Sequence, residues 1–169
     1  MNLVLQEDFV GQYKISTGRF SANDLQLYID KFTKQYLLEL FGKEFYDLFE
    51  ADLDMSNPQV PQTQRFLDIY NEFFLDNTLC NYKSDGIRKM LVKLIYFHFK
   101  RDEPNFGTVT GQIRNENENA TNLVYNGYNL VEAYNEGITD YLAIQHFMLW
   151  NTEIYEEVIS THQEKINGY

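Results

Sequence analysis

The sequence predicts an all-α protein, and two observations carry this prediction. Apolar residues recur with the 3.6-residue period of an α-helix over most of the chain, while the alternation typical of strands is scarce. Only three prolines occur in 169 residues, and proline is the residue that most disrupts helices. We expect a bundle of about four to six helices, with a long extended arm or a short β-hairpin inserted before the C-terminal helix.

Length and composition favour one folded domain over residues 1–169. The chain is 44% hydrophobic, which excludes a disordered protein. No apolar run approaches the roughly 20 residues of a membrane span, and the N-terminus lacks the basic region of a signal peptide, so we expect no membrane contact. Cys80 is the single cysteine, which excludes an internal disulfide and fits a reducing compartment; we expect a small buried side chain.

The stretch from Ser84 to Arg101 is expected to form the central helix. Its apolar residues are spaced so that they cover most of the circumference, which places such a helix among other helices. These residues are Ile87, Met90, Leu91, Leu94, Ile95 and His98. A narrow basic face remains, formed by Arg88, Lys89, Lys93, Lys100 and Arg101.

Three helices are predicted before this one. Residues 1–20 look irregular, with Ile15 and Phe20 turned into the core. Ser21 is a suitable cap for a helix over 22–41, and Gly42 is well placed to end it. A second helix covers 43–51, and the loop 52–61 follows. A third helix begins at Pro61 or Gln62, carries Phe66, Ile69, Tyr70, Phe73 and Phe74, and ends at 76–77.

Residues 102–128 are expected to form an extended arm. The segments 108–110 and 112–114 alternate in a way that suits a short hairpin bending at Gly111, and connections of this length tend to be functional or mobile. The candidate contact residues of the arm are Asn105, Thr108, Val109, Thr110, Gln112, Ile113, Arg114, Asn117 and Asn119. The final helix starts near Asn129 as one bent helix or as two divided at Gly137, and residues 161–169 are expected to fray.

Charge is unevenly spread along the chain. The net charge of −11 disfavours nucleic-acid binding by the whole surface, because such affinity comes largely from Lys and Arg. Residues 83–101 carry six basic residues against one acid, whereas 102–169 carry two against eleven. We therefore expect the basic face of the central helix to pair with acidic residues, either in the same subunit or across an electrostatic interface with a neighbouring one.

No catalytic or metal-binding motif is found. None of the three histidines follows a glutamate at the spacing of a di-iron bundle, and no nucleophile elbow or phosphate loop occurs. His98 lies on the apolar stripe, where a hydrogen-bonded core residue is the simpler interpretation. The carboxylates Glu44, Asp47, Glu50, Asp52 and Asp54 fit a solvated face. We therefore expect a protein that is not an enzyme and needs no cofactor or metal.

The aromatic content of the chain is the observation that points to a function. The chain holds 27 Phe, Tyr and Trp residues, more than one small core readily buries. Aromatic side chains, and tyrosine above all, are enriched at protein–protein contacts. An acidic, aromatic-rich helical chain with a long arm is therefore interpreted as an assembly subunit.

Three stretches of the chain resemble a known family. They are DLQLYIDKFTKQYLLELFGKEFYDLFE, SDGIRKMLVKLIYFHFKRDEPNFGTVTGQIRNENENATN and YNEGITDYLAIQHFM. Their order is similar to that of small head–tail connector (adaptor) proteins of tailed bacteriophages, and most similar to neck ring proteins of crAss-like podophages. The similarity covers roughly residues 25–148, and its motifs are structural.

The resemblance implies a virion protein made in the host cytoplasm and located in the neck between portal and tail. It implies a ring of about twelve copies that contacts the portal and other neck or tail proteins and lets genomic DNA pass without sequence-specific binding. The arm would contact neighbouring subunits. Two other classes stay open: an acidic helical module that inhibits a nucleic-acid-handling partner by imitating phosphates, and an enzyme with an unrecognised site.

Overall fold

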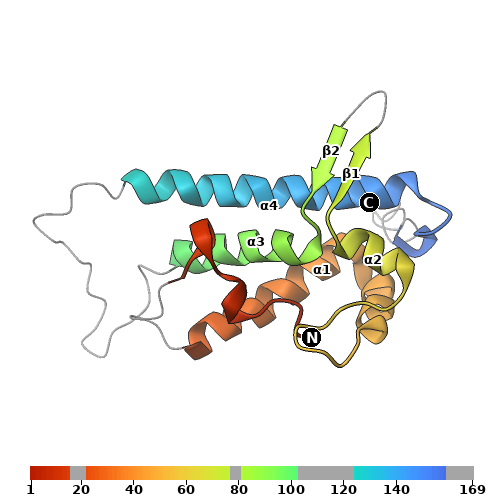
Figure 1. Cartoon of the computed structure of the whole chain (residues 1–169), viewed down its shortest axis with the longest axis horizontal. Coiled ribbons are helices and arrows are strands. Elements are labelled where there is room, and N and C mark those ends of the chain that lie inside the picture. Colours follow the sequence, from red (N-terminus) through yellow and green to blue (C-terminus); the bar gives the residue numbers. More distant parts are fainter. Residues whose placement is uncertain (16–21, 77–80, 103–123, 159–169) are drawn as a thin grey trace, which may run out of the picture.

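The computed structural model describes residues 1–15, 22–76, 81–102 and 124–158 (Figure 1). Within these ranges the chain is mostly helical with one small antiparallel hairpin, which confirms the predicted fold class. The elements are the 3-10 helices η1 (Gln6–Asp8) and η2 (Gly11–Tyr13), the α-helices α1 (Ala22–Asp52), α2 (Gln64–Tyr70), α3 (Ile87–Asp102) and α4 (Val124–Trp150), and the strands β1 (Phe73–Asp76) and β2 (Asn81–Ser84).

The central position of α3 is confirmed. It lies between α4 on one side and α1 on the other (Figure 1). Met90, Leu94 and Phe99 are fully buried, because a helix with neighbours on opposite sides needs apolar residues around most of its circumference. The helix is therefore the scaffold on which the two flanking layers are placed.

α1 changes direction at Gly42, as the sequence predicts. Gly42 has φ 73° and ψ 170°, a backbone conformation that glycine adopts at little cost. The bend turns the second half of α1 toward α2, and four phenylalanines meet there. The ring centroids lie 5.0 Å apart for Phe41 and Phe45, 5.2 Å for Phe45 and Phe66, and 5.4 Å for Phe49 and Phe66.

The prediction that the third helix reaches 76–77 is wrong. α2 ends at Tyr70, and Phe73 and Phe74 lie in β1, where they pair with Ser84 and Lys83 of β2. The ring of Phe73 packs 4.8 Å from that of Phe147 on α4, whereas Phe74 points away and is exposed. Pairing with β2 and packing on α4 override the local helical spacing, which is a weaker preference.

α4 is one continuous helix through Gly137, so the helix is not divided there. A Cβ at position 137 would lie 2.7 Å from Cγ of Leu94, and the glycine therefore allows α3 and α4 to approach closely. The helix ends at Trp150, and Tyr155 returns to the core, where its hydroxyl donates to the carbonyl oxygen of Arg65 at 2.6 Å.

The first fifteen residues hold the outer layers together. Leu3, Val4 and Phe9 are buried, and the prediction that Ile15 enters the core is confirmed. The expectations for Phe20, Ser21, Cys80, the hairpin at 108–114, the arm contacts and the tail fall outside the described residues.

Candidate interaction site

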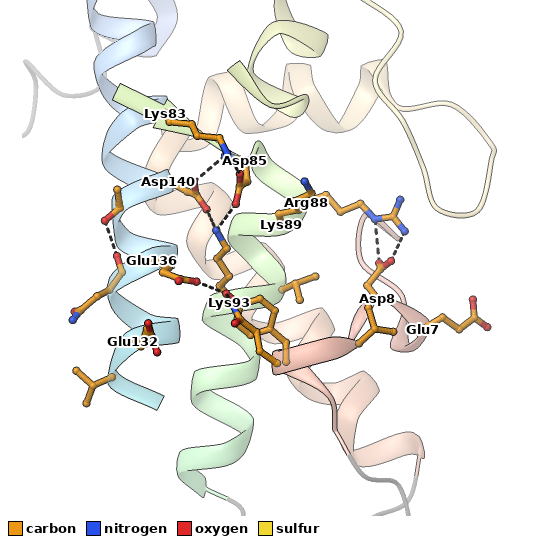
Figure 2. Close-up of a pocket in the computed structure, with 17 residues that line it drawn as sticks. Glu7, Asp8, Lys83, Asp85, Arg88, Lys89, Lys93, Glu132, Glu136 and Asp140 are labelled. Atoms are coloured by element: carbon orange, nitrogen blue, oxygen red, sulfur yellow. Dashed lines mark hydrogen bonds and ion pairs between the residues drawn. The ribbon is translucent and has the colours of Figure 1, made fainter. Parts of the chain in front are cut away.

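A groove of about 1020 Å³ opens between the N-terminal segment, α3 and α4 (Figure 2). Its walls include exposed apolar side chains, Val10 from the N-terminal segment and Val131 from α4. Its floor is charged, with Lys93 from α3 and Asp140 from α4. α3 lies at the bottom of the groove, and the N-terminal segment and α4 form its two sides.

Lys93 is buried at the floor of this groove between two carboxylates. Its Nζ lies 2.7 Å from Oδ2 of Asp85 and 2.7 Å from Oδ2 of Asp140 (Figure 2). The side chains of Lys93 and Asp140 are only 9% and 6% exposed. Asp140 also accepts the backbone N–H of Asp85 at 2.9 Å, so this cluster ties the start of α3 to the middle of α4.

The charges of this cluster stabilise one another. Burial alone would lower the pKa of Lys93, but hydrogen bonds to Asp140 and Asp85 raise it above its ordinary value. The hydrogen bond from Lys93 lowers the pKa of Asp85. Burial raises the pKa of Asp140, and the hydrogen bonds it accepts oppose this. A lysine with a raised pKa stays protonated and is a poor nucleophile, so the cluster has the properties of a structural lock.

The acidic partners of Lys93 belong to the same chain, which is one of the two arrangements that the sequence left open for the basic face of α3. Arg88 forms two hydrogen bonds to Asp8, 3.1 Å from Nε and 2.5 Å from a terminal nitrogen. Lys89 lies at the surface, 3.7 Å from Glu72, and Arg101 contacts Asp102. Lys100 is half-buried. Much of the positive charge on α3 is thus paired with acidic residues of the same chain.

The sequence predicts a core role for His98 and a solvated face for the carboxylates of residues 44–54. His98 forms a hydrogen bond of 2.7 Å between its Nε2 and the Tyr36 hydroxyl and stacks on Phe32 at 3.8 Å, which confirms the core interpretation. Asp52 and Asp54 are half-buried as whole residues, and their carboxylates accept hydrogen bonds at the surface of the protein. Asp52 accepts the N–H groups of Gln62 and Thr63, both at 2.8 Å, and so fixes the start of α2. Glu44, Asp47 and Glu50 are exposed.

His98 makes the stability pH-dependent. Burial, with Arg101 next in importance, lowers its pKa to about 4 from 6.5. A depressed pKa contributes stability above pH 6.5, and this contribution is lost as the pH falls from 6.5 toward 4 because the unfolded chain then binds the extra proton. We expect a loss of about 3 kcal/mol over that window. NMR titration of the imidazole measures the pKa, and His98→Gln should lack this component; an imidazole titrating near 6.5 would contradict it.

The outward side of α4 carries a second set of apolar residues. Val131, Leu142 and Leu149 are 56%, 43% and 41% exposed, whereas the opposite side of the helix packs on α3 through Ala133, Gly137 and Ile144. The spacing of 11 and 7 residues returns them to one side of a helix. We name this surface the outer stripe; its members are Val131, Leu142 and Leu149.

The outer stripe was not predicted from the sequence. The helical period of the last helix does not say by itself which of two apolar sides faces the core. The omitted signal is Val131, which lies with Leu142 and Leu149 on a side opposite to Ala133 and Ile144. A helix that is apolar on both sides is normally covered on both.

Within the described ranges, no set of three His, Cys, Asp or Glu side chains is arranged to hold a metal ion. The helices in those ranges are also too short or too polar to span a bilayer. The chain matches no protein-family model, no curated protein sequence and no solved structure.

Proposed function

We propose that this chain is a structural subunit of a bacteriophage neck, a head–tail connector that assembles into a ring below the portal. Genomic DNA passes through the central channel of this ring without sequence-specific contacts. The proposal makes the chain a virion protein whose partners are further copies of itself, the portal, and neighbouring neck or tail proteins.

The outer stripe of α4 is the observation that carries the assembly role. Val131, Leu142 and Leu149 are exposed to water. A partner that covered them would gain about 25 cal/mol of binding free energy for each Å² of apolar surface buried. Contiguous exposed apolar surface on a soluble chain typically marks a contact with another protein. The stripe contains no charged residue, which is typical of the centre of an interface rather than its rim.

The acidic composition fits the passage of DNA. With a net charge of −11, the surface as a whole repels phosphates, and this repulsion prevents the salt-dependent grip that would hold moving DNA. The family resemblance supplies the remaining details of the proposal, namely about twelve copies per ring and the arm over 102–128 as a contact with neighbouring subunits.

Cryo-electron microscopy of phage particles encoded by the genome that carries this sequence tests the proposal. We expect a ring of identical copies around the DNA channel, between the portal and the tail. Mass spectrometry of purified particles provides the control, because it detects the chain without requiring symmetry. Absence of the chain from every particle would contradict the proposal.

An acidic inhibitor of a nucleic-acid-handling protein is the second candidate. Glu44, Asp47 and Glu50 are exposed on the second half of α1, and exposed carboxylates on one side of a helix can occupy a phosphate-binding surface. Lys43 lies on the same segment and forms an ion pair with Asp47, which reduces the negative charge there. The same particle analysis separates the two candidates, because an inhibitor has no place in the virion.

A further inference from the structure

The three acids of α4 lie along one wall of the groove. Glu132, Glu136 and Asp140 are spaced four residues apart on a helix that contains neither Lys nor Arg, and Figure 2 shows them one above another. Like charges at this spacing destabilise a helix unless a cation neutralises them. Lys93 pairs with Asp140, whereas Glu136 accepts a hydrogen bond from the neutral hydroxyl of Tyr13. Within the described part of the chain, Glu132 and Glu136 therefore have no counter-ion.

A small recess lies beside these two carboxylates. Its volume is about 120 Å³, and it is more enclosed than the groove that it adjoins. Its lining residues are Gln12, Tyr13, Asn129, Glu132, Ala133 and Glu136. Five of these six side chains are polar, and the two charges among them are both negative. The recess is well below the roughly 300 Å³ of the smallest sites for small molecules, so it suits the head group of one cationic side chain.

The hydrogen bonds around the recess leave three carboxylate oxygens for a ligand. The ring of Tyr13 packs edge-on against that of Tyr96, with the centroids 5.6 Å apart. Gln12 donates from Nε2 to the Tyr13 hydroxyl at 2.6 Å, and this hydroxyl donates to Oε2 of Glu136. Among the described residues, no donor reaches Oε1 of Glu136 or either carboxylate oxygen of Glu132. Because these contacts already hold Tyr13 and Glu136 in place, little ordering is needed when a ligand binds.

We propose that the recess binds the guanidinium group of an arginine in a segment of another protein, and that the residues flanking this arginine lie in the groove. A guanidinium carries five N–H donors in one plane and no acceptor, which matches a recess with two carboxylates and no cation. It can form two parallel hydrogen bonds to one carboxylate, so arginine is a better ligand than lysine at such a site. This binding does not require the connector role.

The shape and charge of the groove suit a short protein segment. From the level of Glu132 to that of Asp140, the wall of α4 is about 12 Å long, which is the length of about four extended residues. Val10 and Val131 are 64% and 56% exposed on opposite walls and offer contacts to apolar side chains. Lys83 lies at the Asp140 end (Figure 2) and is 66% exposed, so an acid of the segment can pair with it. The expected segment thus carries an arginine, apolar residues and an acid, in this spatial order.

NMR titration of the isotope-labelled chain with the acetylated and amidated peptide Arg-Leu-Leu-Asp tests the proposal. We expect saturable shifts of the backbone amides around Tyr13, Glu132 and Glu136, with a Kd at or below about 1 mM. Citrulline in place of the arginine keeps the shape without the charge and should weaken binding at least about tenfold, and lysine should weaken it at least about threefold. Shifts confined to other surfaces, or equal binding of the arginine and citrulline peptides, would overturn the proposal.

Two variants with the same net charge separate a site from general attraction to an acidic protein. Glu132 lines the recess, whereas Glu153 is exposed beyond the end of α4. Glu132→Gln should weaken peptide binding at least about fivefold, and Glu153→Gln should leave it unchanged. Equal effects of the two substitutions would refute the site. Spermidine is the final probe: if it binds at the same amides as tightly as the peptide, the recess accepts any small organic cation and the protein segment is rejected as its occupant.

Discussion

Replacing Gly86 with alanine should destabilise the protein by about 3 to 5 kcal/mol. Gly86 has φ 87°, and a Cβ there would lie 2.3 Å from the carbonyl oxygen of Tyr70 and 2.7 Å from the carbonyl carbon of Asn71. Both atoms belong to the backbone, so no side chain can rotate away to relieve the overlap. The expected result is a lower urea midpoint with an unchanged slope of unfolding free energy against urea.

Gly11→Ala is the matched control for this prediction. Gly11 also has a positive φ, 60°, but no atom lies within 4 Å of the position that a Cβ would take. Its replacement carries only the conformational cost of an L-residue in that region, about 1 kcal/mol. Equal losses at positions 86 and 11 would show that the contact between Gly86 and the end of α2 is looser than the structure indicates.

Replacing Lys93 with methionine should cost about 3 to 5 kcal/mol, because it leaves the buried carboxylate of Asp140 without its counter-ion. Asp140 would retain the backbone N–H of Asp85 as a donor, which does not neutralise its charge. The loss is measured as the change in unfolding free energy at neutral pH.

The double variant Lys93→Met/Asp140→Asn should recover at least half of that loss. An asparagine at position 140 keeps an oxygen for the N–H of Asp85 and removes the unpaired charge. Lys89→Met serves as the control, since the ion pair of Lys89 with Glu72 is exposed and such pairs contribute at most about 1 kcal/mol. A double variant as unstable as Lys93→Met would mean that packing of the lysine stem, rather than charge, sets the cost.

The helices were predictable where local signals agree with packing. Gly42 follows an apolar turn and precedes another, and the chain bends there. The helical period of α3 predicted which of its residues are buried, because the helix is covered on opposite sides. Phe73 and Phe74 misled the prediction because they extend the period of α2, while the partner that makes them a strand, β2, lies beyond the segment.

The interaction site was less predictable, because its contacts join residues far apart in the chain. Lys93 is one of five basic residues on α3, and what buries it is Asp140, 47 residues later. Nothing in the local sequence separates Lys93 from the exposed Lys89. The outer stripe, in contrast, is visible in the sequence through the spacing of Val131 and Leu149. It could be recognised as exposed only once the structure showed which side of α4 faces the core.

The N-terminal segment has a consequence for synthesis on the ribosome. Tyr13 donates a hydrogen bond to Glu136, 123 residues later, and Asp8 binds Arg88, 80 residues later. At about 5 to 20 residues per second, the segment waits roughly 6 to 25 s between its own translation and that of Glu136. During that interval Leu3, Val4 and Phe9 have no finished core to enter, so the first residues made are among the last to find their native places.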